Sequence, residues 1–138
     1  MSRQMIAFGR SGTHPSQRMV QLASGLGLAD SLIIDQHFTQ RNRLGRLTTA
    51  VALNPGMIGI GIDEDTALLI SPEQECEVIG TGTVTLIDGR GIEYNDVYKA
   101  KRHDSFTVEG VEVQVLNSGM HYVISPSLQP DFMSAASA

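Results

Sequence analysis

The sequence predicts an α/β fold whose buried strands end in polar residues at one edge of a sheet. The aliphatic run 32–34 changes abruptly to Asp35-Gln36-His37, and the run 57–62 changes to Asp63-Glu64-Asp65. An apolar pattern with helical spacing lies between the two runs. Because open α/β folds bind ligands at the ends of their strands, this edge is the expected functional site.

Composition indicates one ordinary globular domain of 138 residues, with 41% hydrophobic and 18% charged residues. The net charge of −5 argues against a dedicated nucleic-acid-binding protein. No apolar run approaches the length of a membrane span, so we expect a soluble cytoplasmic protein. Three of the ten Lys and Arg residues nevertheless fall between positions 41 and 46, which favours an anionic small ligand.

Cys76 is the single cysteine of the chain, so no intramolecular disulfide can form and a reducing compartment fits. Its neighbours Glu75 and Glu77 would disfavour a thiolate. We therefore expect a small buried hydrophobic residue at this position rather than a nucleophile.

The N-terminal part of the chain is predicted to be helical. Met1, Met5, Ile6 and Phe8 have the spacing of one helix face, although no capping residue precedes them. Residues 11–15 form a loop, and residues 19–23 suggest a short helix that stops at the glycines 25 and 27. The first central strand, with its polar end, follows over residues 31–38.

The middle of the chain alternates between helix and strand, and the remainder consists of strands and turns. Helical spacing predicts a helix from about Gln40 to Leu53, ended by Asn54-Pro55-Gly56. Buried stretches follow at 57–62 and 66–71. Further strands are expected at 78–79, 83–87, 92–97, 106–108, 111–115 and 121–125. We expect a single domain over residues 1–126 and a disordered tail over 127–138.

His37 is the first candidate for chemistry. A histidine at a strand end often only bonds to the backbone, but the polar neighbours of His37 make a purely structural role less convincing. A neutral imidazole can act as a general base when a carboxylate orients its other ring nitrogen. Glu64 can be that carboxylate, because neighbouring parallel strands bring their C-terminal ends to the same edge of the sheet.

Other patterns carry less weight. The acidic run 63–65 also fits a solvated turn, and the nearby arginines argue against a metal site shared with Asp35, so no metal or cofactor is expected. Gly80 and Gly82 lack the helix that would follow in a phosphate-binding loop. The remaining histidines, at positions 14, 103 and 121, form no constellation. No serine occurs in a Gly-x-Ser-x-Gly context, so the base has no evident nucleophile.

Three blocks of residues resemble cyanophycinases, which are serine-type exopeptidases of the peptidase E-like group. The blocks are Ile34-Asp35-Gln36-His37-Phe38, Arg41 with the segment 43–47, and the segment 59–67 (GIGIDEDTA). The later segment 78–84 (VIGTGTV) also fits, and the resemblance extends over most of the chain from about Gly25. It implies a three-layer α/β/α fold of the class I glutamine-amidotransferase type, with a C-terminal end rich in β-hairpins.

The resemblance also implies roles for individual residues. His37 would be the general base and Glu64 its orienting acid, completing a triad with a serine in a Gly-Thr-Ser-Ala-Gly-like elbow. The residues expected to line the pocket for cyanophycin are Asp35, Gln36, Arg41, Arg43 and Arg46. The three arginines are expected to be at least partly exposed around this pocket, which His37 would border. Cyanophycin has a poly-aspartate backbone with an arginine on each side-chain carboxyl, and its cleavage releases β-aspartyl-arginine dipeptides. Guanidinium groups match its carboxylates, and Asp35 would meet its guanidinium groups.

The chain departs from this family in lacking the serine elbow, so we expect it to be the C-terminal portion of a cyanophycinase that starts at an internal methionine. Two alternatives remain open. The first is another peptidase E-like hydrolase that acts on aspartyl or isoaspartyl peptides. The second is a non-catalytic protein that binds acidic peptides in the arginine-lined pocket. Homodimer formation also stays open.

Overall fold

The computed structural model describes residues 2–124 and consists mainly of β-strands with one α-helix in that range. Four strands form the central sheet in the order β10-β7-β4-β3. These are β3 (Leu32–Gln36), β4 (Ile58–Ile62), β7 (Thr83–Asp88) and β10 (Glu112–Asn117). The strands β3 and β4 are parallel, whereas β7 is antiparallel to both β4 and β10.

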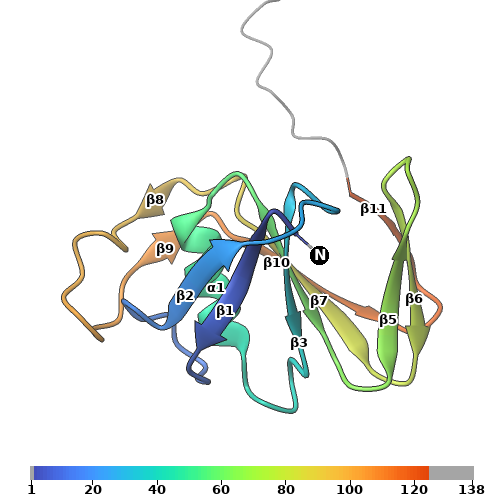
Figure 1. Cartoon of the computed structure of the whole chain (residues 1–138), viewed down its shortest axis with the longest axis horizontal. Coiled ribbons are helices and arrows are strands. Elements are labelled where there is room, and N and C mark those ends of the chain that lie inside the picture. Colours follow the sequence, from blue (N-terminus) through green and yellow to red (C-terminus); the bar gives the residue numbers. More distant parts are fainter. Residues whose placement is uncertain (1, 125–138) are drawn as a thin grey trace, which may run out of the picture.

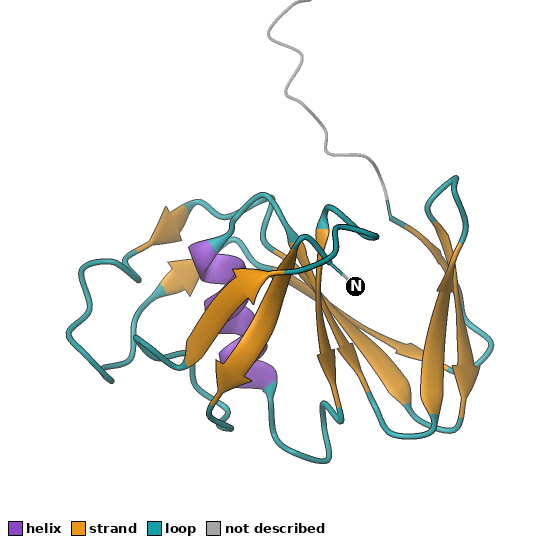
Figure 2. Cartoon of the chain, viewed as in Figure 1, coloured by secondary structure: helices purple, strands orange, loops and turns teal. Residues whose placement is uncertain are grey.

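The two faces of the central sheet are covered by different elements (Figure 1). Helix α1 (Leu44–Leu53) and the hairpin β1 (Gln4–Gly9) and β2 (Val20–Ser24) lie on one side. On the other side stands a second sheet in the order β11-β6-β5. Its strands are β5 (Thr66–Ile70), β6 (Glu75–Gly80) and β11 (His121–Val123). The short pair β8 (Tyr94–Asn95) and β9 (Val108–Glu109) completes the described chain (Figure 2).

Each face has its own hydrophobic core. Buried aliphatic side chains of β3, β4 and β7 pack against Cys76 and Val78 of the second sheet. On the opposite face, Ile33 and Ile87 pack against Leu47 and Val51 of α1. The alternation of side chains along each strand sends neighbours to opposite faces, so one strand such as β3 serves both cores.

The α/β class predicted from the sequence is confirmed at this level, as are the central strands. The resemblance also implied a hairpin-rich C-terminal end, but β10 pairs with β7 and β11 pairs with β6, so neither strand pairs with its neighbour in the sequence. The predicted helix is also present, although it begins at Leu44 rather than near Gln40. The residues described contain a helix on one face of the central sheet and a second sheet on the other. The finer three-layer α/β/α arrangement is therefore not seen in this part of the chain, and the predicted tail lies outside it.

Two expected helices are wrong. Residues 4–9 and 20–24 form the antiparallel strands β1 and β2, with Gln4 opposite Ser24 and Gly9 opposite Val20. The apolar residues in both segments have a spacing that also fits one face of a helix. Pairing of the two strands, however, lets Ile6, Val20 and Leu22 pack together against the core on the α1 side of the sheet. Cross-strand pairing thus decides a pattern that is ambiguous in short segments.

Cys76 is buried in β6 as a free thiol, as predicted. Burial raises the pKa of this thiol above its ordinary value. The residue therefore stays neutral and packs in the core between the two sheets.

Two glycines of β4 bring the neighbouring elements close to the sheet. A Cβ atom at Gly59 would lie 2.8 Å from Val51 Cγ2 of α1, and one at Gly61 would lie 2.4 Å from Cγ of the Phe38 ring. Both glycines alternate with isoleucines that fill the opposite core. The sequence Gly-Ile-Gly-Ile therefore fits a strand with one crowded face and one aliphatic face.

We expect the substitution Gly61→Ala to destabilise the chain by about 2 kcal/mol, because the Phe38 ring has to move out of a packed core. Urea unfolding followed by circular dichroism measures the change. Gly56→Ala is the matched control, since no atom lies within 4 Å of the added Cβ. Equal unfolding midpoints for the two variants would show that the packing of the Phe38 ring does not require a glycine at position 61.

Candidate active site

The parallel register of β3 and β4 brings the two candidate catalytic residues together. Gln36, the last residue of β3, lies opposite Ile62, the last residue of β4. His37 and Glu64 follow directly, and His37 Nδ1 lies 3.0 Å from Glu64 Oε1. The predicted proximity of these side chains at one end of the parallel strands is confirmed, whereas their catalytic role stays a prediction.

The hydrogen bond determines which nitrogen of His37 is available for chemistry. A carboxylate only accepts hydrogen bonds, so Nδ1 carries the proton of this bond and Nε2 of the neutral ring keeps its lone pair. Both side chains are about half exposed, at 45% for His37 and 51% for Glu64. The hydrogen bonds of residues 2–124 give His37 no serine, threonine or cysteine partner.

The backbone at this edge of the sheet is unusual in a way that the sequence does not reveal. His37, Asn42 and Asp65 adopt positive φ angles of 49°, 48° and 51°. Residues other than glycine adopt this left-handed conformation at a cost of about 1 kcal/mol or more. At His37 this conformation ends β3 and turns the chain into the 38–43 loop, which places the imidazole beside β4.

Asp63, which from the sequence alone fits an acidic turn, holds two other segments in position. It is buried, and its Oδ1 accepts hydrogen bonds from Thr39 N at 3.0 Å and Thr39 Oγ1 at 2.7 Å. Its Oδ2 accepts from Thr83 N at 3.1 Å and Thr83 Oγ1 at 2.9 Å. Asp63 therefore ties the loop after His37 to the start of β7.

The pKa of Asp63 reflects these contacts. Desolvation by burial raises it, but the four hydrogen bonds from Thr39 and Thr83 outweigh burial and hold the pKa below its ordinary value. A carboxyl whose folded-state pKa is lowered stabilises the fold above its unfolded-state pKa. That stabilisation disappears as the pH falls through the folded-state pKa.

Gln40 supports the other member of the pair. Its side-chain oxygen accepts a hydrogen bond of 3.2 Å from the backbone nitrogen of Glu64. The loop that follows His37 thus holds the segment that carries Glu64 at two points, one through Asp63 and one through Gln40. In the sequence, only the positions of Thr39 and Gln40 shortly after His37 indicate these contacts.

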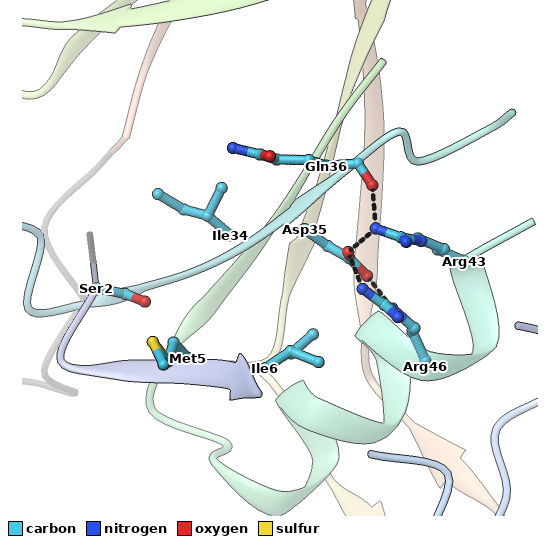
Figure 3. A pocket seen from close by; sticks show the side chains of 8 residues that line it. All are labelled: Ser2, Met5, Ile6, Ile34, Asp35, Gln36, Arg43 and Arg46. Atoms are coloured by element: carbon cyan, nitrogen blue, oxygen red, sulfur yellow. Dashed lines mark hydrogen bonds and ion pairs between the residues drawn. The ribbon is translucent and has the colours of Figure 1, made fainter. Parts of the chain in front are cut away.

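Four of the other predicted site residues, Asp35, Gln36, Arg43 and Arg46, form a second cluster at the end of β3 (Figure 3). Asp35 is 2% exposed and accepts hydrogen bonds from Arg46 Nε at 2.6 Å and from Arg43 Nη1 at 3.0 Å. Arg46 Nη2 reaches the second oxygen of the same carboxylate, so that Arg46 binds it with two donors. Arg43 also donates to the backbone oxygen of Gln36.

This arrangement corrects one expectation. The three arginines were expected to be at least partly exposed, but Arg46 of α1 is buried, with 9% exposure, and its guanidinium group binds Asp35 and the backbone oxygen of Gly9. Arg43 is half-buried and Arg41 is exposed. Asp35 was expected to meet a guanidinium of the substrate, and in this structure both of its oxygens are taken by the protein's own guanidinium groups. Their assignment to substrate binding stays a prediction.

A pocket of about 330 Å³ lies beside this cluster. Asp35, Gln36, Arg43 and Arg46 form its polar wall, and apolar side chains of β1 and β3 form the other, together with Ser2 (Figure 3). Neither His37 nor Arg41 is part of the lining. The pocket follows the edge of β3 that carries no further strand in the described sheet. Polar donors and an apolar wall suit a ligand with both anionic and aliphatic parts.

Residues 2–124 contain no group of three or more His, Cys, Asp or Glu side chains arranged to hold a metal ion. In the same range no helix is long and apolar enough to cross a membrane.

Comparison with characterised proteins relates these residues to one group of enzymes. The cyanophycinase of Geminocystis herdmanii is 40% identical over 122 residues, which cover 88% of this chain and 45% of that protein. The chain is similar to cyanophycinases over most of its own length. The cyanophycinase of Nostoc sp. is 40% identical over 119 residues, and that of Thermosynechococcus vestitus is 36% identical over 118. No family model matches the sequence.

The resemblance to cyanophycinases stated from the sequence motifs is thus confirmed, and it extends over most of the chain. The cyanophycinase-like chain nevertheless spans less than half the length of these relatives: 45%, 40% and 37% of the three proteins. The His37–Glu64 pair and the Asp35–Arg46 cluster both lie in this shared portion.

Proposed function

We propose that the chain forms part of a cyanophycin-degrading serine-type peptidase and carries the base, the acid and the substrate arginines of its site. The observation that carries this proposal is the bond of 3.0 Å between His37 Nδ1 and Glu64 Oε1 at the ends of two parallel strands. The similarity to cyanophycinases from several cyanobacteria supports it. The proposal includes the three-layer α/β/α fold for the complete enzyme and the cytoplasm as its compartment.

In this proposal the nucleophile is a serine from a segment that this chain does not contain. His37 Nε2 takes the proton of the serine hydroxyl while the serine oxygen attacks the peptide carbonyl carbon. When the tetrahedral intermediate collapses, the C–N bond breaks and the proton passes from His37 to the leaving amine. Water, activated by the same nitrogen, then hydrolyses the ester and releases the β-aspartyl-arginine product.

The role of Glu64 in this sequence is electrostatic. It holds the Nδ1–H tautomer and stabilises the imidazolium that exists between the two proton transfers. Arg41 and Arg43, with the pocket beside β3, supply positive charge near the site for the carboxylates of an acidic polymer. Asp35 keeps Arg43 and Arg46 in place rather than competing for the substrate.

A chimera tests the proposal. The segment of the Geminocystis herdmanii cyanophycinase that matches this chain is replaced by the chain's own residues, and release of β-aspartyl-arginine from cyanophycin is measured. We expect the chimera to turn over cyanophycin, and the 138-residue chain alone to be inactive and prone to association, because it lacks the nucleophile and β3 has an open edge.

Three results would contradict the proposal. A soluble chimera that binds cyanophycin without cleaving it would favour the non-catalytic acidic-peptide-binding alternative. A chimera that cleaves isoaspartyl dipeptides but not the polymer would favour another peptidase E-like activity. Turnover by the 138-residue chain alone would show that the nucleophile lies within it.

A further inference from the structure

A second pocket, distinct from the candidate active site, concentrates positive charge and hydroxyl groups. It has a volume of about 370 Å³ and lies between the β1–β2 loop and the loop that joins β8 to β9. Arg10, His14 and His103 line it, together with four hydroxyl residues: Ser11, Thr13, Ser16 and Ser105. Asn42 also lines it, so this pocket shares the loop that carries Arg41 and Arg43.

Backbone hydrogen bonds hold the walls of this pocket in place. Ser16 and Ser105 form an antiparallel bridge, and Gln17 exchanges hydrogen bonds with Asp104 and His103 at 2.9 and 3.2 Å. Gly12 donates to the backbone oxygen of Asn42 at 2.8 Å. Three loops that are distant in the sequence are thus fastened to one another, which preorganises the side chains they carry.

The positive charges of Arg10, in this pocket, and of Arg102, which bonds to the lining residue His103 from outside it, are not balanced. Arg10 Nη2 lies 2.7 Å from His103 Nδ1, and Arg102 Nε lies 3.2 Å from His103 Nε2. Both guanidinium groups only donate, whereas a neutral imidazole has a single lone pair, so one of the two contacts places donor against donor. Within residues 2–124, neither Arg10 nor Arg102 has a carboxylate within 4.0 Å.

Two further features around this pocket also indicate that it would favour an anion. His103 adopts a positive φ angle of 69°, as does Arg18, with 60°, in the loop outside the lining; this conformation costs free energy for residues other than glycine. The pKa of His103 lies below its ordinary value through local desolvation and the positive charges of Arg10, Arg102 and Arg18, against which Asp104 acts weakly. A bound anion would offset these positive charges.

We propose that the pocket between Arg10 and His103 binds a carboxylate of the substrate, beyond the residue that is cleaved. This inference rests on the proposed function. An arginine joined through its amine to an aspartyl side chain keeps its own carboxylate free, so a cyanophycin chain presents one such carboxylate at every repeat. Arg10 supplies a two-donor fork for this group, and the surrounding hydroxyls supply further donors.

The experiment measures binding rather than cleavage. The full chain, and in parallel the chimera with its His37 replaced by alanine, is titrated with β-aspartyl-arginine or with inorganic phosphate, while the pKa of His103 is followed by NMR. We expect β-aspartyl-arginine to raise the pKa of His103, because a bound carboxylate stabilises the imidazolium. We also expect its affinity to fall as the pH rises through that pKa.

The variant Arg10→Gln should weaken β-aspartyl-arginine binding about tenfold and abolish the pKa change. The control Arg3→Gln, an exposed arginine outside the pocket, should leave both unchanged. Three results would overturn the inference: an unchanged His103 pKa, tighter binding of phosphate than of β-aspartyl-arginine, or equal binding by the Arg10→Gln variant. If the chimera with His37 intact does not cleave cyanophycin while this binding is still observed, the proposed function alone would be overturned.

Discussion

Replacing His37 by alanine in an active chimera should lower kcat for cyanophycin by about 10⁴- to 10⁶-fold, the range found when a triad base is removed. Without the imidazole, no described side chain in hydrogen-bonding contact with Glu64 can accept the proton of a serine hydroxyl. The value of KM should change little, because His37 is outside the lining of the pocket beside β3. Steady-state kinetics of β-aspartyl-arginine release measures both quantities.

Glu64→Gln should have a smaller effect, about 10³- to 10⁴-fold on kcat, because a neutral amide no longer stabilises the imidazolium. Its neighbour Asp65 is the matched control. Asp65 is exposed, and asparagine tolerates its positive φ angle, so Asp65→Asn should retain normal turnover. If His37→Ala kept kcat within tenfold of the unmodified chimera, the assignment of the base would be wrong.

The substitution Asp35→Asn should destabilise the chain by about 3–5 kcal/mol, the usual cost of removing one partner from a buried ion pair. Asp35 is 2% exposed and its carboxylate receives three guanidinium hydrogen bonds. An amide in its place would leave Arg46 buried with an uncompensated charge. Urea unfolding of the purified chain, or of the chimera, measures the change in free energy.

Two further variants separate this buried pair from ordinary surface charge. Arg46→Lys should keep only part of the stability that the Asp35–Arg46 pair provides, because an ammonium group cannot reproduce the two donors that face Asp35. Arg41→Gln should change stability by no more than about 0.5 kcal/mol, since Arg41 is exposed and has no carboxylate partner in residues 2–124. Equal losses for the Asp35 and Arg41 variants would mean that Asp35 does not anchor the site.

These predictions divide the residues of the site by what they do. His37 and Glu64 are exposed enough to meet a substrate and a nucleophile from another segment, and their bond is expected to matter for rate more than for stability. Asp35, Arg46 and Asp63 are buried and are expected to matter first for stability. Measuring both quantities for each variant therefore tests the division directly.

The position of the candidate site could be predicted from local sequence patterns. Aliphatic runs that end in polar residues predicted two buried strands, and their parallel pairing predicted that His37 and Glu64 would meet. The helix between them followed from its 3.6-residue spacing, because its apolar face is long enough to be distinguished from a strand. Local pattern is sufficient where one element buries one continuous face.

Other features depend on contacts between residues that are distant in the sequence, and local patterns left them ambiguous. Residues 4–9 and 20–24 became strands because each provides the hydrogen-bonding partner of the other, a long-range fact that the apolar spacing of either segment does not contain. The positive φ angle of His37 and the burial of Arg46 also depend on neighbours distant in the sequence. Asp63 looked like part of a solvated acidic turn, and it is buried because Thr39 and Thr83 converge on its carboxylate from two other elements.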